Sequence, residues 1–247
     1  MEATCRRAIE IGLPGISFTE HADHVPGVHP TLRPLDIPGY HAEIERCQAL
    51  FPDLRILSGV ELGEPHRYPA ETAAVLAAGP LDRVLGSVHC FDWRGRLIDA
   101  SQLSRLPLTD VREAVRSYFR ELCALVGSDQ QFQVLAHLDY PKRYWPHSEI
   151  RYRERDYEEE IRAVLRGAAA RHVVLELNTT RGALPERGLC PGPIVLRWWV
   201  EEGGRALTLG SDSHEPAKIA QGFALAAQLA GAAGFKPNDD PTSFWRR

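Results

Sequence analysis

The sequence has no long hydrophobic run, and its first residues do not have the pattern of a signal peptide. Among its 247 residues, no apolar stretch approaches the roughly 20 residues that a membrane-spanning helix needs. No charged-then-apolar segment of the kind that directs secretion opens the chain. We therefore expect a cytoplasmic protein without a membrane partner. The chain is long enough to bury a full hydrophobic core as a single domain over residues 1–247.

The sequence also lacks a cysteine framework and a basic block. Its five cysteines are scattered, without a C-x-x-C pair, which excludes a zinc knuckle and predicts reduced, mostly structural thiols. The formal net charge is −4, and no dense run of Lys and Arg stands out. This balance argues against a nucleic-acid partner and favours a small-molecule substrate, and it says nothing about oligomeric state.

What the sequence does contain is an alternation of short apolar runs and longer helical patterns. The predicted strands are Gly15–Thr19, Arg55–Val60, Arg83–Val88, Gln133–Ala136, Val173–Leu177 and Ala206–Leu209. The predicted helices are Met1–Gly12, Pro69–Ala78, Thr109–Val126, Glu154–Arg171 and Ala217–Ala233. This alternation predicts an α/β fold with parallel strands joined by crossover helices, either a barrel or a doubly wound sheet.

The start of the chain does not fit the usual order of such a fold. Met1–Gly12 has the pattern of an amphipathic helix and leads directly into a strand, whereas a β/α fold normally begins with a strand. The segment His24–Pro38, which contains four prolines, is predicted to be an irregular loop beside the first strand. The chain therefore reads as if it begins in the middle of a β/α unit.

Asp, Glu or His follows five of the six predicted strands. These residue types make up 43 of the 247 positions (33 acidic residues and 10 histidines), so chance places one at any position less than a fifth of the time. The carboxyl ends of barrel strands form the active-site face, where side chains from distant segments meet. Imidazole and carboxylate donors without thiols suit Zn²⁺, Mn²⁺ or Fe²⁺.

The last strand adds a local argument. Asp212 and His214 are two residues apart after Ala206–Leu209, and in extended backbone such residues point to the same side. A single histidine after a strand is more often a hydrogen-bonded loop or core residue. The prediction of a shared metal site therefore depends on the whole series, and His24 and His66 are interpreted as structural.

The ordered motifs resemble the polymerase-and-histidinol-phosphatase (PHP) superfamily, and within it the histidinol-phosphatase branch. The matching segments are Phe18–His21, Gly59–Glu61, Gly86–His89, Ala136–Asp139, Glu176–Asn178 and Gly210–His214, supported by His137–Tyr144, Leu177–Thr180 and Leu209–Pro216. Each motif is weak alone, but together they cover nearly the whole chain. The resemblance implies a distorted seven-stranded β/α barrel, a (β/α)7 PHP-type fold, that holds two or three divalent metal ions.

The resemblance also implies roles for particular residues. The implied metal ligands are His21, Glu61, His89, His137, Asp212 and His214. Glu61 would bridge two ions, with His89 and His137 on one of them and Asp212 on the other, while His21 and His214 would hold a third. The implied substrate-binding residues are Asn178, Lys142, Arg143 and Arg181. Arg181 is favoured as a phosphate clamp because a guanidinium matches phosphate oxygens bidentately, although a solvated loop arginine is an equal alternative.

The implied activity is hydrolysis of a phosphomonoester, L-histidinol phosphate, to L-histidinol and phosphate in histidine biosynthesis. A hydroxide held on the metal ions would attack phosphorus directly, without a covalent phosphoenzyme. Glu61 and Asp212 are the implied catalytic residues. Asp212 or a metal-held water would handle the leaving-group proton, and the sequence does not choose between them.

The chain departs from the family at its start, because the family opens with an H-x-H strand that supplies metal ligands. Here the first histidine is His21, so the first strand and its ligands are missing. One hypothesis is that Met1 is an internal residue of a longer native chain, through truncation or a misassigned start. If the chain is complete, the first metal site lacks two ligands, and the resemblance implies a catalytically impaired metal- or phosphate-binding domain.

Two other enzyme classes compete with this interpretation. His89–Arg96 fits the H-C-x₅-R pattern of cysteine-dependent phosphatases, in which a thiolate attacks phosphorus; its bulky interior and Asp92 argue against it. A PHP-type nuclease or nucleotide phosphoesterase is the second class. The acidic balance and the lack of interleaved lysines and aromatics favour a small phosphomonoester over nucleic acid.

Overall fold

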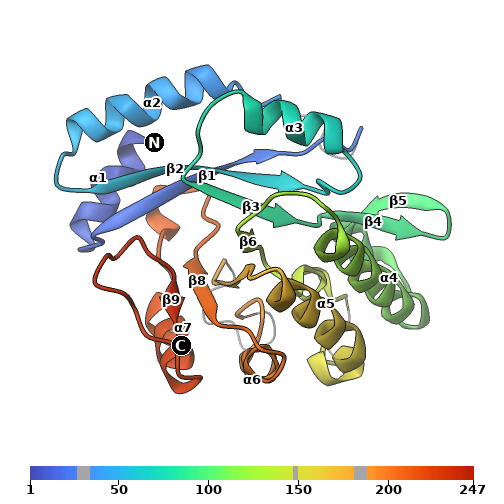
Figure 1. Cartoon of the computed structure of the whole chain (residues 1–247). Helices are drawn as coiled ribbons and strands as arrows, with labels where there is room; N and C mark the ends of the chain where they lie inside the picture. The colour runs from blue at the N-terminus through green and yellow to red at the C-terminus, as the bar shows by residue number, and fades with distance from the viewer. Residues whose placement is uncertain (27–33, 147–149, 181–187) are drawn as a thin grey trace.

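The computed structural model describes residues 1–26, 34–146, 150–180 and 188–247. Its centre is a curled seven-stranded sheet with the order β1-β2-β3-β6-β7-β8-β9 (Figure 1). The strands are β1 (Gly15–Ala22), β2 (Arg55–Gly63), β3 (Arg83–Ser87), β6 (Val134–Leu135), β7 (Val174–Asn178), β8 (Ala206–Gly210) and β9 (Trp245–Arg246). All neighbours pair in parallel except β8 and β9. The predicted α/β fold of distorted-barrel type is confirmed.

Helices lie around the outer side of this sheet (Figure 1). The α-helices are α1 (Glu2–Glu10), α2 (Ile37–Leu50), α3 (Pro69–Ala77), α4 (Leu108–Gly127), α5 (Glu158–Ala170), α6 (Pro193–Glu201) and α7 (Phe223–Ala232). Short 3₁₀ helices are η1 (Ala100–Arg105), η2 (Tyr140–Tyr144), η3 (Glu154–Tyr157) and η4 (Pro216–Lys218). In the described residues ahead of β1 the chain is helical, as its amphipathic pattern predicts.

Several elements differ from the sequence-based prediction. An antiparallel hairpin of β4 (Cys90–Trp93) and β5 (Arg96–Asp99) follows β3. The expected helix over Ala217–Ala233 is divided into η4 and α7, because the backbone leaves the helical region at Ile219, which is extended, and at Ala220 and Gly222, which have φ values of 54° and 75°. The loop expected over His24–Pro38 gives way to α2 at Ile37, and residues 27–33 lie outside the described part.

The longest helix shows how the sequence builds the core. Along α4, buried residues recur at helical spacing, from Val111 and Ala114 to Tyr118, Leu122 and Leu125. They form one apolar stripe against the sheet and against α5. Parallel strands that are covered by crossover helices are buried on both faces. In β2, accordingly, every residue from Ser58 to Gly63 is buried.

The parallel register brings the carboxyl ends of the strands to one edge. His21 lies opposite Glu61 in the β1–β2 ladder, and Gly63 lies opposite Ser87 in the β2–β3 ladder. On the other side of the sheet, Asn178 lies opposite Gly210. Residues just beyond these positions are therefore gathered at the same mouth of the fold.

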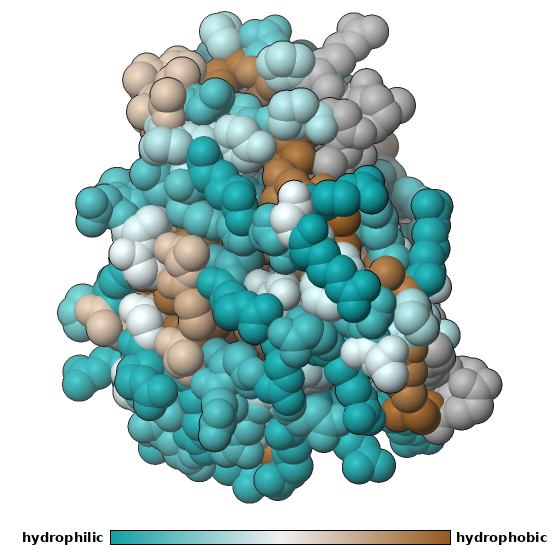
Figure 2. All heavy atoms as spheres, turned by 90° about the vertical axis from the view of Figure 1, so that its right-hand side faces the viewer, coloured by the Kyte–Doolittle hydropathy of each residue, from teal (hydrophilic) through white to brown (hydrophobic). Residues whose placement is uncertain are grey.

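The face in Figure 2, seen from the right-hand side of Figure 1, is predominantly hydrophilic, and its hydrophobic side chains appear as separate spots. Across the described ranges, no helix combines the length and the apolarity needed to cross a bilayer.

Candidate metal centre

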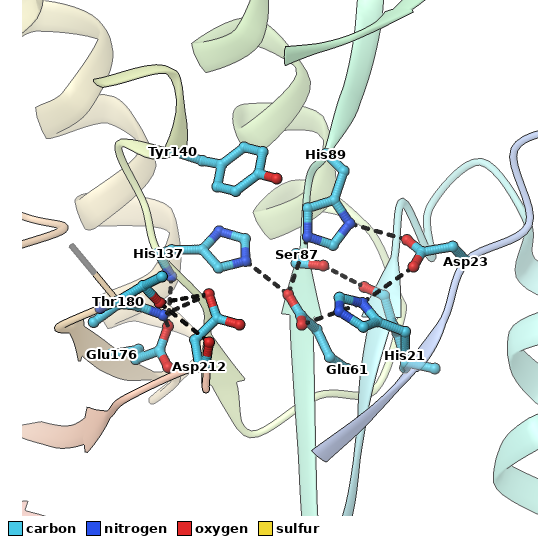
Figure 3. Close-up of polar contacts among 12 residues, drawn as sticks. His21, Asp23, Glu61, Ser87, His89, His137, Tyr140, Glu176, Thr180 and Asp212 are labelled. Atoms are coloured by element: carbon cyan, nitrogen blue, oxygen red, sulfur yellow. Dashed lines mark hydrogen bonds and ion pairs between the residues drawn. The ribbon is translucent and has the colours of Figure 1, made fainter. Parts of the chain in front are cut away.

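Glu61 lies at the centre of a group of three histidines: His21 is in β1, His89 follows β3 and His137 follows β6 (Figure 3). Its Oε1 is 2.7 Å from His137 Nε2 and 3.2 Å from His89 Nε2. Its other oxygen, Oε2, is 3.5 Å from His21 Nδ1. The side chains of Glu61, His89 and His137 are each at most 6% exposed. One buried carboxylate thus points one oxygen toward two imidazoles and the other oxygen toward a third.

The electrostatics of this group favour positive charge. Burial alone would raise the pKa of Glu61, but the charges of His89 and His137 and their hydrogen bonds hold it well below its usual range. Burial lowers the pKa of His137. For His89 burial also opposes the charge, yet Glu61 and Asp23 raise its pKa well above the ordinary value. The carboxylates of Glu61 and Asp23 therefore favour the protonated, positively charged form of His89 when no metal ion is bound.

Asp23 is a second buried carboxylate in this group, one residue beyond the end of β1. Its Oδ1 lies 2.9 Å from His89 Nδ1, and its Oδ2 lies 3.1 Å from His21 Nδ1. Burial opposes its ionisation, but the hydrogen bonds from His21 and His89 lower its pKa strongly. The same hydrogen bond raises the pKa of His21 to about 9. A carboxylate on the far nitrogen of an imidazole fixes its tautomer and orientation, as in many metal sites.

Asp212 forms the opposite flank of the site (Figure 3). Its Oδ2 accepts hydrogen bonds from Thr180 Oγ1 at 2.9 Å and from Asn178 Nδ2 at 3.3 Å, and it is 2.9 Å from Arg143 Nη1. Burial and the negative charge of Glu61 oppose its ionisation, but Arg143, His137 and the Thr180 hydrogen bond together lower the pKa of Asp212. Asp212 is therefore an anion bound to a buried guanidinium.

The structure brings most of the predicted site residues together. Arg143 also donates from Nη2 to Asn178 Oδ1 at 2.7 Å, so two of the predicted substrate-binding residues lie beside Asp212. The rings of His21 and His214 are 5.6 Å apart between centroids, so these two residues are neighbours.

Two predicted substrate-binding residues are not placed in this group. The Lys142 ammonium is buried against Glu154 Oε1 at 2.9 Å and the Leu189 carbonyl at 3.1 Å, contacts that hold the chain together rather than face the ligand histidines. Arg181 lies outside the described residues.

The cysteine-phosphatase alternative is wrong for this fold. Cys90–Arg96 forms the β4–β5 hairpin, with Cys90 opposite Asp99 and Trp93 opposite Arg96. Cys90 is fully buried, and burial strongly raises the pKa of its thiol, with Glu64 and Asp99 adding to the effect. A buried neutral thiol in an extended strand is not a phosphate-cradling nucleophile.

The donor set fits divalent metal ions. Donor atoms of His21, Glu61 and His89 all lie within 4.8 Å of one another, the spacing at which one cation can be held. His21 Nδ1 and Asp23 Oδ2 are both buried without a hydrogen bond of good geometry, which is costly unless a further group binds them. Nitrogen and carboxylate oxygen donors suit Zn²⁺, Mn²⁺ or Fe²⁺.

Sequence reasoning missed Asp23, Thr180 and Tyr140. Asp23 stands two residues after His21, the same spacing that pairs His214 with Asp212, so the alternation of an extended strand contained the signal. The Tyr140 ring packs 4.7 Å from the His137 ring and 5.1 Å from the His89 ring, and no sequence pattern points to that contact.

Comparison with known proteins identifies a family and several similar proteins. Residues 1–180 match the profile of the family described as PHP domain. A histidinol-phosphatase of Lactococcus lactis is 30% identical over 231 residues, which cover 92% of this chain and 83% of that protein. A protein named probable histidinol-phosphatase from Clostridium acetobutylicum is 30% identical over 227 residues, covering 90% and 84%.

A solved structure is also similar. The crystal structure of the Lactococcus lactis histidinol phosphate phosphatase, complexed with zinc, L-histidinol and phosphate, superposes with a TM-score of 0.82 at 27% identity. The match covers 95% of this chain and 87% of the other.

Proposed function

The chain belongs to the PHP domain family, and from this premise we propose that it is a metal-dependent phosphomonoesterase that hydrolyses L-histidinol phosphate to L-histidinol and phosphate. The observation that carries the proposal is the position of Glu61, which is contacted by His21 in β1 and by His89 and His137, which follow β3 and β6. A relative with 30% identity over most of its length is a histidinol-phosphatase, and a similar structure contains zinc, L-histidinol and phosphate. The activity would serve histidine biosynthesis in the cytoplasm.

The proposal includes two or three divalent ions (Zn²⁺, Mn²⁺ or Fe²⁺) held by His21, Glu61, His89, His137, Asp212 and His214. Such ions, when bound, withdraw charge from phosphate oxygens and lower the pKa of water. Glu61 suits a bridging role because its two oxygens face different histidines. Asp23 holds His89 by Nδ1, which leaves Nε2 directed at Glu61.

Arg143 is the residue best placed to bind the phosphate. Its side chain is only 6% exposed, and it already holds the Asp212 carboxylate and the Asn178 amide oxygen. A guanidinium in this position offers planar, paired donors that can bind two oxygens of a phosphate. Asn178 Nδ2 adds a neutral donor beside it.

Asp212 is the residue best placed to carry the leaving-group proton. Its Oδ2 is the oxygen bound by Arg143 and Thr180. Once phosphate competes for Arg143, one of the three interactions that lower the pKa of Asp212 weakens, and burial and Glu61 then raise that pKa. A carboxylate whose proton affinity rises when substrate binds fits general acid–base catalysis.

Phosphate release tests the proposal. The metal-free chain is assayed with L-histidinol phosphate, with and without added Zn²⁺ or Mn²⁺, beside nucleoside monophosphates and single-stranded DNA at equal concentration. We expect metal-dependent turnover of L-histidinol phosphate. Cleavage of the nucleotides or DNA in preference to L-histidinol phosphate would overturn the substrate assignment.

A version of the chain with an added H-x-H segment ahead of Met1 is the matched control for the ligands that the family resemblance implies. Turnover by the extended chain alone would identify the ligands contributed by that segment as necessary. Turnover by neither chain, with metal bound, would favour the non-catalytic binding domain.

A further inference from the structure

Two buried glutamates outside the predicted ligand set bind the backbone of the two central histidines. Glu64 Oε1 accepts hydrogen bonds from the His89 amide at 2.5 Å and from the Cys90 amide at 2.7 Å. Glu176 Oε2 accepts from the His137 amide at 2.7 Å and from Asn178 Nδ2 at 3.1 Å (Figure 3). The two glutamates are 0% and 4% exposed, respectively.

These amides need side-chain acceptors because the histidines lie beyond the regular ladders. The β2–β3 ladder ends at the pair Gly63–Ser87, and the β6–β7 ladder ends at Leu135–Leu175. A buried N–H that has left the ladder is costly without an acceptor. Each glutamate therefore supplies, at the edge of the sheet, the acceptor that a neighbouring strand would otherwise have provided.

The two glutamates act from opposite flanks. In the order β2-β3-β6-β7, His89 and His137 follow the two inner strands. Glu64 comes directly after β2 on one outer side, and Glu176 lies within β7 on the other. The pair of ligand histidines is thus held between two carboxylates, one from each neighbouring strand.

The backbone at His137 adds a reason for such a restraint. Its φ is +22°, in the region that residues other than glycine rarely adopt, and this conformation persists only where surrounding contacts enforce it. The Glu176 hydrogen bond is attached to that same residue's amide. Without it, the peptide is free to relax toward an ordinary conformation, which would swing the imidazole.

We propose that Glu64 and Glu176 are positioning residues for the metal centre: by holding the backbone amides of His89 and His137, they direct both Nε2 atoms at Glu61 Oε1. The inference rests on the metal centre of the proposed function and not on the identity of the substrate. Neither glutamate touches metal or phosphate in this role.

The hydrogen-bond pattern predicts which substitutions should preserve the positioning role of each glutamate. Each glutamate uses a single oxygen for both of its donors. Glutamine keeps that oxygen, methionine keeps the chain length without an acceptor, and aspartate keeps the charge but is one methylene too short to reach. We therefore expect Gln to substitute for Glu at both positions, and expect Met and Asp to fail.

The experiment measures metal affinity rather than turnover. Metal-free wild type and the variants Glu64→Gln, Glu64→Met, Glu64→Asp, Glu176→Gln, Glu176→Met and Glu176→Asp are titrated with Zn²⁺ against a chromophoric chelator, and with Co²⁺ to record the ligand-field spectrum. The Met and Asp variants are expected to bind about 10- to 100-fold more weakly, with an altered Co²⁺ spectrum, whereas the Gln variants stay within about threefold of wild type. If a Met variant does not fold, the metal affinity of the Asp variant at the same position tests the role of that glutamate.

Glu121→Met is the matched control, because Glu121 is also buried and ion-paired, by His66 and Arg67, but bonds to no ligand histidine. It is expected to lower thermal stability and leave metal affinity unchanged. Unchanged affinity in the Met and Asp variants, equal loss in the Gln variants, or equal loss in Glu121→Met would each overturn the inference. Absence of metal binding by wild type would instead overturn the metal centre itself, and metal binding without turnover of L-histidinol phosphate would overturn only the proposed substrate.

Discussion

Two buried clusters of histidine and carboxylate lie in the described part of the chain, and they differ in which groups balance the charge of the carboxylate. Glu121, on α4, is bound by Arg67 through both oxygens and by His66 Nε2. Glu61, on β2, contacts only histidines among the described residues: His21, His89 and His137. A permanent guanidinium neutralises the first carboxylate, whereas the second relies on imidazoles that can lose their charge.

The comparison shows that the side chains bound to a buried carboxylate indicate a metal site better than its burial or a nearby pocket does. A hollow of about 440 Å³ lies over Glu121 and is lined also by Asp92, Trp93, Arg94, Glu113, Ser117 and Arg120. None of the predicted metal ligands lines it. The charge of Glu121 is already neutralised by Arg67. Glu61 and the neighbouring Asp23 have no such permanent cation among the described residues, so they favour binding of a metal ion.

The largest effect is expected from removing the charge at the centre of the first cluster. Glu61→Gln should lower kcat/KM for L-histidinol phosphate by at least about 10²-fold, since even an outer-shell partner of a metal typically costs 10- to 100-fold. Metal content, measured on the same sample, should fall with it. Glu121→Gln is the control and should keep both. A Glu61→Gln protein with near wild-type activity would contradict the assignment.

Metal binding should increase the thermal stability of the protein only when the Glu61 cluster is intact, whereas changes in the Glu121 cluster should not affect this increase. One ion at about 100 times its Kd adds about 2.7 kcal/mol to folding, which corresponds to roughly 5–10 °C in Tm for a chain of this size. We expect this increment in wild type and in Glu121→Gln when Zn²⁺ or Mn²⁺ is restored. Glu61→Gln should lose it, and an equal increment there would place the bound ion elsewhere.

Asp23 should show an intermediate effect because it holds two ligand histidines without being in the predicted ligand set. Asp23→Ala removes the acceptor at His89 Nδ1 and is expected to weaken metal binding and turnover by about 10- to 100-fold. Asp23→Asn keeps one oxygen and should lose less. Metal titration measures both, and an Asn variant as defective as the Ala variant would point to charge rather than orientation.

The smallest effect is expected for the Glu121 cluster, in the pH dependence of the free energy of unfolding. Burial opposes ionisation of Glu121, but hydrogen bonds from His66 and Arg67 lower its pKa from 4.5 to about 2. A carboxyl with a lowered folded-state pKa stabilises the fold fully above about pH 4.5, and this stabilisation is lost as pH falls toward 2. Urea unfolding of metal-free wild type and Glu121→Gln should therefore differ most at pH 6, and the difference should shrink as the pH falls from about 4.5 toward 2. A constant difference would contradict this.

Much of the fold follows from the sequence because parallel strands buried on both faces read as apolar runs. The six predicted strands correspond to β1, β2, β3, β6, β7 and β8. The β4–β5 hairpin was missed because its sequence, Cys90–Asp99, mixes apolar and charged residues, and its tight turn at Arg94 and Gly95 carries only one glycine. β9 is two residues long, and only its pairing with β8 defines it.

The site was predictable wherever a residue's role depends on strand position. Glu61, His89 and His137 each lie at the carboxyl edge of the sheet, where the topology of the fold gathers them. Glu64 and Glu176 act through backbone amides, and that depends on where each ladder ends, which a single sequence does not reveal. Lys142 was predicted beside the substrate from its motif, but its ammonium is bound by Glu154, a residue 12 positions away.

The most direct test of the central claim is a crystal structure of the metal-loaded protein with anomalous data collected at the metal edge. The account predicts at least one anomalous peak about 2.0–2.2 Å from a Glu61 oxygen, with His89 and His137 nitrogens on the same ion. Peaks found only at other positions, with Glu61 still bonded to histidines alone, would contradict it.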